Sequence, residues 1–204
     1  MSLLLSLKTW SAPIPYKPSL DSGSSIQYTL PYSMGIHEGK IKTITGIVSL
    51  DLEHSIGSGE LHVPIEALET GKEEQNCHLR EAMGLNYQSS DFPKEHVCDK
   101  NHQLPSSGKN AIAYPEIIFK ISSIKTTSDT ALTVNGVWTM HGVSHPAQIE
   151  MKLRHQGDQL RLQGEIHISL KDYGIEVKSA RVLFVTISVH DQATVKLDLI
   201  FIKS

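Results

Sequence analysis

The chain has 204 residues, of which 39% are hydrophobic and 20% are charged, and its formal net charge is −3. This composition is typical of a globular protein, and the lack of clustered Lys and Arg excludes the usual footprint of a nucleic-acid-binding protein. No apolar run approaches the roughly 20 residues that a membrane-spanning helix needs. The length suits one large β-domain.

Residues 1–24 are expected to form an N-terminal arm. The apolar stretch 3–7 resembles the end of a secretory signal peptide, but Lys8 interrupts it, so a signal remnant and a plain arm fit equally well. Three prolines between residues 13 and 18 are expected to exclude regular structure and to leave an extended lead-in. The folded domain is therefore expected to span residues 25–204.

From residue 25 onward, apolar and polar residues alternate in short segments. This period of two predicts β-strands, with Gly46 at a bend and a turn at 56–59. The expected strands are 41–52, 60–68, 117–125, 131–140, 147–154, 160–170, 181–189 and 194–202. Their spacing and short links predict an all-β fold, an extended antiparallel β-barrel of about eight strands.

One segment interrupts the strands. Residues 72–86 are rich in Glu, Gln, Leu, Ala and Met and predict a short helix, whereas residues 89–111 have the composition of a loop. We therefore expect a helix and loop insertion in the barrel.

Residues of one parity form apolar rows along the predicted strands. In the strand 160–170, for example, the even positions are Leu or Ile except at Gly164, and the odd positions are Arg161, Gln163, Glu165, His167 and Ser169. One face is therefore apolar and the other hydrated. An eight-stranded barrel is just wide enough to be filled by its own side chains or to hold one small ligand. The rows alone favour the packed core.

Five motifs in fixed order resemble the YceI-like family of bacterial, lipocalin-like, polyisoprenoid-binding proteins. They are LETGKEEQNCHL (68–79), SSDF (89–92), YPEIIFK (114–120), LTVNGVWTMHGVSHPAQIEMKL (132–153) and KDYGI (171–175). The resemblance covers roughly residues 25–190. It implies a lipocalin-like barrel that holds a polyisoprenoid lipid, with a quinone or prenyl phosphate head, in a periplasmic or secreted protein. It also implies a homodimer, and we expect transient membrane contact without a transmembrane segment.

The resemblance and the apolar rows together indicate ligand-binding residues. They are Phe119, Val134, Trp138, Met140, Ile149, Met151, Ile166, Ile168, Lys171, Asp172, Tyr173 and Phe184. The polar head is expected near the KDYGI turn and the insertion. The family usually carries Arg two residues before the Asp of this turn, and here that residue is Leu170. Lys171 offers only a point charge in its place.

We expect binding without catalysis and without any cofactor other than the lipid. No Gly-x-Ser-x-Gly elbow marks a nucleophile, and His141 and His145 flank a predicted turn, where their spacing does not ensure a metal site. Two alternatives remain: a ligand-free barrel that serves as an interaction or envelope-stress module, and a metal-dependent enzyme.

Cys77 and Cys98 are the only cysteines in the chain. They lack the Cys-x-x-Cys spacing of a redox pair, and a zinc site with His78, His96 and His102 would lack paired ligand spacing. A disulfide between them is the favoured prediction, with unpaired thiols next and zinc last. In an oxidising compartment it would stabilise the fold by roughly 3 kcal/mol.

Overall fold

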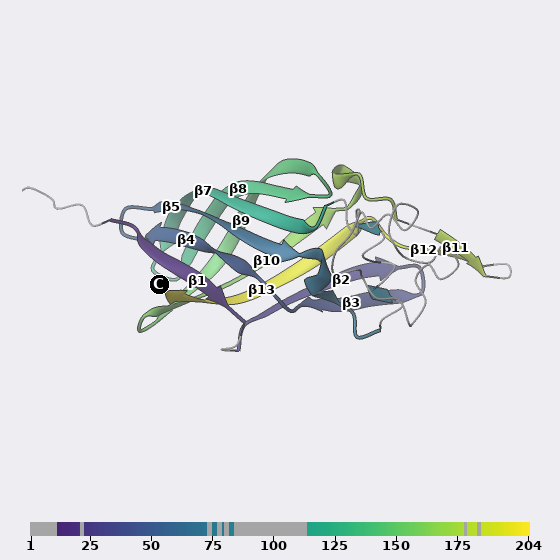
Figure 1. The fold of residues 1–204 in the computed structure, drawn as a ribbon, viewed down its shortest axis with the longest axis horizontal. Helices are drawn as coiled ribbons and strands as arrows, with labels where there is room; N and C mark the ends of the chain where they lie inside the picture. Colours follow the sequence, from purple (N-terminus) through teal and green to yellow (C-terminus); the bar gives the residue numbers. More distant parts are fainter. Residues whose placement is uncertain are drawn as a thin grey trace, which may run out of the picture.

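A computed structural model describes residues 12–20, 23–72, 75, 76, 79, 82, 83, 114–177, 179–182 and 185–204 (Figure 1). The strands among these residues are β1 (Ile14–Ser19), β2 (Ser25–Tyr32), β3 (Gly35–Ile41), β4 (Thr45–Asp51), β5 (Ile56–Pro64), β6 (Leu68–Glu69), β7 (Glu116–Ser128), β8 (Ala131–Met140), β9 (Val143–Gln156), β10 (Gln159–Ser169), β11 (Ser179–Val182), β12 (Val185–Ser188) and β13 (Gln192–Lys203). Two single turns of 3-10 helix join them, η1 (Ile65–Ala67) and η3 (Lys171–Tyr173).

The main sheet closes on itself. Neighbouring strands follow the order β1-β4-β5-β7-β8-β9-β10-β13, and β13 pairs back onto β1. β13 is long enough to meet two strands along one edge, because residues 200–203 pair with β1 and residues 194–198 pair with β2. β2 continues the sheet to β3 and β6. The closed, antiparallel, eight-stranded barrel predicted from the sequence is confirmed.

The expectation that the N-terminal prolines exclude regular structure is wrong, because residues 14–19 form β1. Pro15 lies in the half of β1 that pairs in register with β4, opposite Ser49. Pro18 lies in the half that pairs with β13, opposite Phe201. Each proline therefore has a ladder partner on one side only, as at a sheet edge, where its missing N–H is tolerated.

The first predicted turn is displaced. Residues 56–59 belong to β5, and the chain reverses instead at residues 52–55, where Ser55 has a φ of 56°. The expected strand 41–52 is also divided, because β3 ends at Ile41 and β4 begins at Thr45. The glycines of 56–59 indicated a turn, but Gly57 and Gly59 lie within the β4–β5 ladder.

The barrel splits at one end. β9 and β10 pair from the turn at residues 157–158 as far as Met151 and Gly164. Beyond that pair, among the described residues, 143–150 of β9 pair with β8, while 165–169 of β10 pair with β13. η3 comes directly after β10, so it lies at this split end.

The predicted strand 181–189 is wrong as a barrel strand. Residues 181 and 182 belong to β11 and residues 185–188 to β12, and these strands form a separate two-stranded sheet beyond the split end of the barrel (Figure 1). The base of this sheet is held to the β2–β3 hairpin, where Tyr32 bridges Val189 and Ser33 N donates to Ser188 O at 2.9 Å. A continuous apolar run has no alternation to show where a chain reverses, so the pattern concealed this hairpin.

The insertion is described only in part. Residues 75, 76, 79 and 82 are helical, and the amide of Met83 donates to the carbonyl of Leu79 at 3.0 Å. The helix predicted over 72–86 is therefore present at residues 75, 76, 79 and 82, whereas Lys72 lies before it and Met83 is in a turn.

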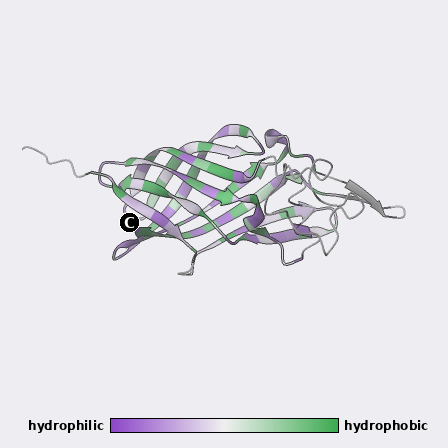
Figure 2. Ribbon diagram, in the orientation of Figure 1, coloured by the Kyte–Doolittle hydropathy of each residue, from purple (hydrophilic) through white to green (hydrophobic). Residues whose placement is uncertain are grey.

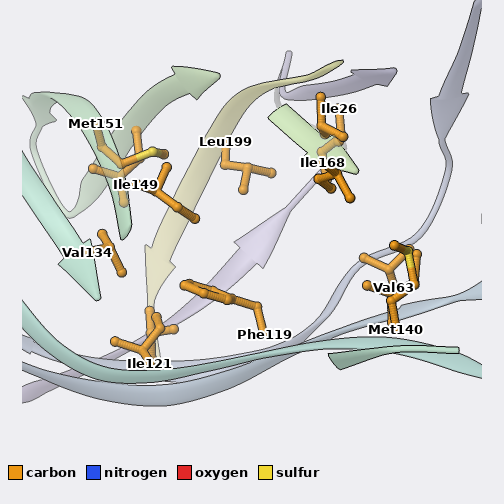
Figure 3. Close-up of a cluster of buried hydrophobic side chains, with 14 of the residues drawn as sticks. Ile26, Val63, Phe119, Ile121, Val134, Met140, Ile149, Met151, Ile168 and Leu199 are labelled. Carbon is orange, nitrogen blue, oxygen red and sulfur yellow. The ribbon is translucent and has the colours of Figure 1, made fainter. Parts of the chain in front are cut away.

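The alternation of the sequence becomes the inside and outside of the barrel. Apolar and polar residues alternate along its strands in Figure 2. The inward rows form one buried cluster that runs through the barrel, and labelled side chains from β2, β5, β7, β8, β9, β10 and β13 point toward one another in Figure 3. On β10, Leu160, Leu162 and Ile168 are buried, as predicted from their parity.

Candidate ligand-binding interior

The predicted ligand-binding residues occupy two places in the structure. Those buried in the inner wall are Phe119, Val134, Met140, Ile149, Met151 and Ile168. Trp138 and Ile166 share the inward parity but are only half-buried and pack against this wall. On η3, the side chains of Lys171 and Asp172 are exposed, whereas Tyr173 is buried. Phe184 lies outside the described residues.

Four glycines on the inner face each lie beneath a large side chain of the adjacent strand. A Cβ placed on any of them would meet that side chain well within contact distance, as at Gly136, where it would lie 2.8 Å from the ring of Phe119. The pairs are Gly39 with Tyr28, Gly57 with Ile124, Gly136 with Phe119 and Gly164 with Met151. The missing Cβ lets the larger partner lie along the wall instead of across the interior. A glycine at inward parity is the sequence signal for such a place.

Trp138 supplies a polar atom to this apolar wall. Its ring packs against Phe119, with centroids 5.5 Å apart and planes tilted by 45°. The indole Nε1 is buried, and no acceptor among the described residues lies within hydrogen-bonding distance of it. An indole nitrogen can only donate, and a buried donor without a partner costs about 1–3 kcal/mol. Trp138 was predicted as an apolar contact, and parity gave no signal of its unpaired donor.

Two histidines hold η3 against the barrel at the split end. The β8–β9 turn has positive φ angles at His141 (53°) and Gly142 (76°). His141 Nδ1 donates to the carbonyl of Tyr173 at 3.1 Å, and His145 Nε2 donates to the carbonyl of Asp172 at 2.9 Å. The ring of His145 also meets Tyr173 edge to face, 5.0 Å away. Burial, reinforced by the charge of Asp172, raises the pKa of Tyr173, so its hydroxyl stays protonated.

Asp191 fixes the other side of η3. One carboxylate oxygen accepts from Ser169 Oγ and the other from the amide of Lys171, both at 2.7 Å. The hydrogen bond from Ser169, followed by that from Lys171 N and the charge of Lys171, holds the pKa of Asp191 below its ordinary value. Leu170 stands where the resemblance would place Arg, and it packs against the apolar cluster. Sequence reasoning did not identify Asp191, which lies 20 residues from the turn that it supports.

A second polar network ties β6 to the helical segment. Asn76 is 1% exposed, accepts from the amide of Thr70 at 2.8 Å and donates to Glu69 at 2.8 Å. Glu69 also accepts from Gly71 N and Lys42 Nζ, both at 2.7 Å. These bonds, that of Lys42 first, lower the pKa of Glu69 to about 2. Within the first family-like motif, 68–79, Glu69, Thr70 and Asn76 therefore bond to one another.

Several features predicted from the sequence lie in parts of the chain that the structure does not describe. Cys77, Cys98 and the SSDF motif lie outside the described residues, so the disulfide stays a prediction. Within the described residues, no group of three or more His, Cys, Asp or Glu is arranged to hold a metal ion. In the same part of the chain, no helix has the length and apolar character that crossing a bilayer would require.

The fold and the interior together define a class: an elongated, lipocalin-like β-barrel with a continuous apolar inner wall and polar anchors at one split end. The family model for the YceI-like domain matches residues 20–201. The chain therefore belongs to the YceI-like family, as the five motifs indicated.

Solved structures share the fold at low sequence identity. BcnA of Burkholderia cenocepacia is 14% identical, with a TM-score of 0.65 over 88% of this chain and 96% of that one. A polyisoprenoid-binding domain from Saccharophagus degradans, implicated in plant cell wall breakdown, is 10% identical, with a TM-score of 0.61 over 94% and 99%. The YceI protein of Campylobacter jejuni is 10% identical, with a TM-score of 0.57 over 82% and 85%. None of the curated proteins compared with the chain matches it.

Proposed function

We propose that this protein binds a polyisoprenoid lipid inside its barrel and serves in the transport, storage or sequestration of that lipid, without catalysis. The observation that carries the proposal is the continuous apolar inner wall, to which β2, β4, β5, β7, β8, β9, β10 and β13 all contribute buried side chains (Figure 3). Membership of the YceI-like family and the fold shared with a polyisoprenoid-binding domain support it. We place this activity in the bacterial periplasm or outside the cell.

The inner wall suits a long hydrocarbon chain. Burial of apolar surface stabilises a complex by about 25 cal/mol per Å², or about 0.8 kcal/mol for each methylene. Binding by this wall should therefore strengthen with tail length until the interior is filled.

The alternative is a barrel packed by its own side chains and used as an interaction module. The four glycine contacts favour the lipid carrier. Large side chains that would otherwise cross the interior, such as Phe119 and Tyr28, lie over a glycine of the neighbouring strand. With a Cβ at those positions these side chains would have to turn toward the interior, where they would occupy space that a ligand needs.

Release or uptake of the lipid would bring the protein to a bilayer. Met34 and Ile36, in the β2–β3 hairpin at the split end, are 66% and 59% exposed. Exposed apolar side chains at a hairpin can enter the headgroup region of a membrane. They support transient membrane contact through this end, whereas the proposed homodimer rests on the family resemblance alone.

The direct test is to purify the protein from a bacterial host that makes polyprenyl quinones and to extract it with organic solvent. Mass spectrometry should find an isoprenoid in roughly stoichiometric amount. Val134→Trp, which adds bulk at a buried inward position of β8, should retain much less. The matched control Val137→Trp, at a position 38% exposed on the same strand, should retain as much as the wild type. Wild-type protein that yields no lipid and takes none up from added quinone would refute the proposal.

A further inference from the structure

Trp138 lies near the split end of the barrel, three residues before His141 in the β8–β9 turn. It pairs in register with Phe119 of β7 on one side and with His145 of β9 on the other. Because His145 bonds to the backbone of η3, the indole lies on the strand next to the one that η3 covers. Its buried Nε1 is therefore a donor placed at the end where a ligand head would lie while the tail follows the apolar wall.

The charges near this end disfavour an anionic head. Lys171 is the only cation on η3, and its side chain is exposed. Its backbone amide donates to the carboxylate of Asp191. Asp172 adds a second negative charge on the same turn. Leu170, at the place where the resemblance would put Arg, packs into the apolar cluster. Among the described residues of this turn and its Asp191 support, a phosphate would thus meet two carboxylates and no guanidinium fork, the group best suited to bind it.

We propose that Trp138 Nε1 donates a hydrogen bond to an uncharged acceptor oxygen in the head of the bound isoprenoid, of the kind that a quinone carbonyl provides. This assignment rests on the proposed function and narrows it, because it makes the protein selective for neutral, oxygen-bearing heads over phosphate heads. Trp138 then contributes both an apolar surface to the wall and the donor that positions the head.

The test uses three probes that share one geranylgeranyl tail and differ only in the head: a benzoquinone, a monophosphate, and a hydrocarbon without oxygen. Calorimetry should show that the wild-type protein binds the quinone probe most tightly. Trp138→Phe keeps an aromatic ring and removes the donor, so the Kd of the quinone probe should rise about tenfold, which corresponds to about 1.4 kcal/mol. The Kd of the hydrocarbon probe should stay within about twofold.

Phe119→Leu is the matched control, because it removes the ring that packs on the indole and leaves the donor. It should weaken the binding of all three probes alike. If Trp138→Phe also weakens them alike, the indole acts by packing and the proposed bond is refuted. Tighter binding of the phosphate probe than of the quinone probe would refute the selectivity. Failure of the wild type to bind any probe would instead overturn the proposed function.

A second measurement does not require Trp138 to be replaced. In a Trp10→Phe background Trp138 is the only indole, and the ultraviolet resonance Raman band that reports N–H hydrogen bonding can be followed as each probe is added. The quinone probe should shift this band toward the hydrogen-bonded form, and the hydrocarbon probe should leave it unchanged. An unchanged band with bound quinone would contradict the proposal even if Trp138→Phe failed to fold.

Discussion

The two ends of the barrel are held together by different interactions. At the closed end, around residues 52–55 and 157–158, backbone ladders run up to the turns, and Thr126 Oγ1 adds a 2.9 Å bond to the carbonyl of Leu52. At the split end, β9 and β10 part after Met151 and Gly164, and His141, His145, Ser169 and Asp191 hold η3 across the gap.

This difference in bonding indicates which end of the barrel opens more easily. A ladder opens only when several backbone bonds break together, whereas each side-chain bond contributes a net 0.5–1.5 kcal/mol or so. Local opening should therefore start at the split end, where η3 and the β2–β3 hairpin lie. Four predictions test this contrast, from the largest expected effect to the smallest.

The closed end should carry most of the stability. Leu153 is 2% exposed, and its amide bonds to the carbonyl of Thr130 beside the β7–β8 turn. Leu153→Ala should lower the free energy of unfolding by about 3 kcal/mol, because it leaves a cavity in a ladder-bound core. Urea denaturation measures this loss. The exposed neighbour Lys152 is the control, and Lys152→Ala should change the value by less than about 0.5 kcal/mol. Equal losses of unfolding free energy in Leu153→Ala and Lys152→Ala would contradict a stabilising core at the closed end.

Membrane contact should depend on the split end alone. Met34→Ser combined with Ile36→Ser should reduce co-sedimentation with phospholipid vesicles about tenfold, since two exposed apolar side chains are removed. Ile47→Ser is the matched control, because Ile47 is 49% exposed on β4, away from the β2–β3 hairpin. If the control reduces partitioning as much as the double variant, the contact is not localised to the hairpin.

Glu69 should make the connection between β6 and the helical segment sensitive to acid. Its pKa is about 2 in the folded protein, below the ordinary value of 4.5, so its stabilising effect is complete above pH 4.5 and is lost as the pH falls toward 2. The carboxylate is partly exposed, so Glu69→Gln should lower the free energy of unfolding by only about 1 kcal/mol at pH 7. Thermal unfolding between pH 2 and 7 should show that the variant lacks this part of the pH dependence. If the unfolding temperature of the variant changes with pH in parallel with that of the wild type, the contribution assigned to Glu69 is refuted.

The smallest expected effect is a change in amide hydrogen exchange confined to η3. Asp191→Ala removes the acceptor of two bonds at η3, so the amides of residues 171–175 should exchange with deuterium about tenfold faster. The amide of Leu153 at the closed end should keep its protection. Asp129→Ala, in the exposed β7–β8 turn, is the control and should leave η3 unchanged. Faster exchange at both ends would show that they open together.

The predictive power of the sequence varied along the chain with the range of the interactions involved. Alternation on β10 identified both its buried and its exposed faces, because side chains of a strand alternate whatever it pairs with. The same reasoning failed at residues 181–189, where an apolar run hid a hairpin, and at β1, where a proline-containing segment found ladder partners far along the chain. The partners of β1 are distant in the chain and cannot be read from local sequence, whereas the β11–β12 hairpin pairs neighbouring residues and was missed because the apolar run contains no turn residue.

In the candidate site, too, some features followed from local sequence and others depended on contacts between distant segments. The apolar residues of its wall, such as Val134 and Ile149, were identified from parity, and the position of η3 from the KDYGI motif. Asp191 and the unpaired donor of Trp138 were not, because a hydrogen bond depends on distances between segments and not on residue type.

By itself, the sequence determined an all-β chain with one apolar face, because hydrophobic period and turn residues act over a few positions. Only the tertiary structure decided where the barrel closes, where it splits, and that the indole donor of Trp138 has no acceptor among the described residues. Those features arise when β13 meets both β1 and β2 and when β9 and β10 part, so they depend on pairings between residues distant in the chain.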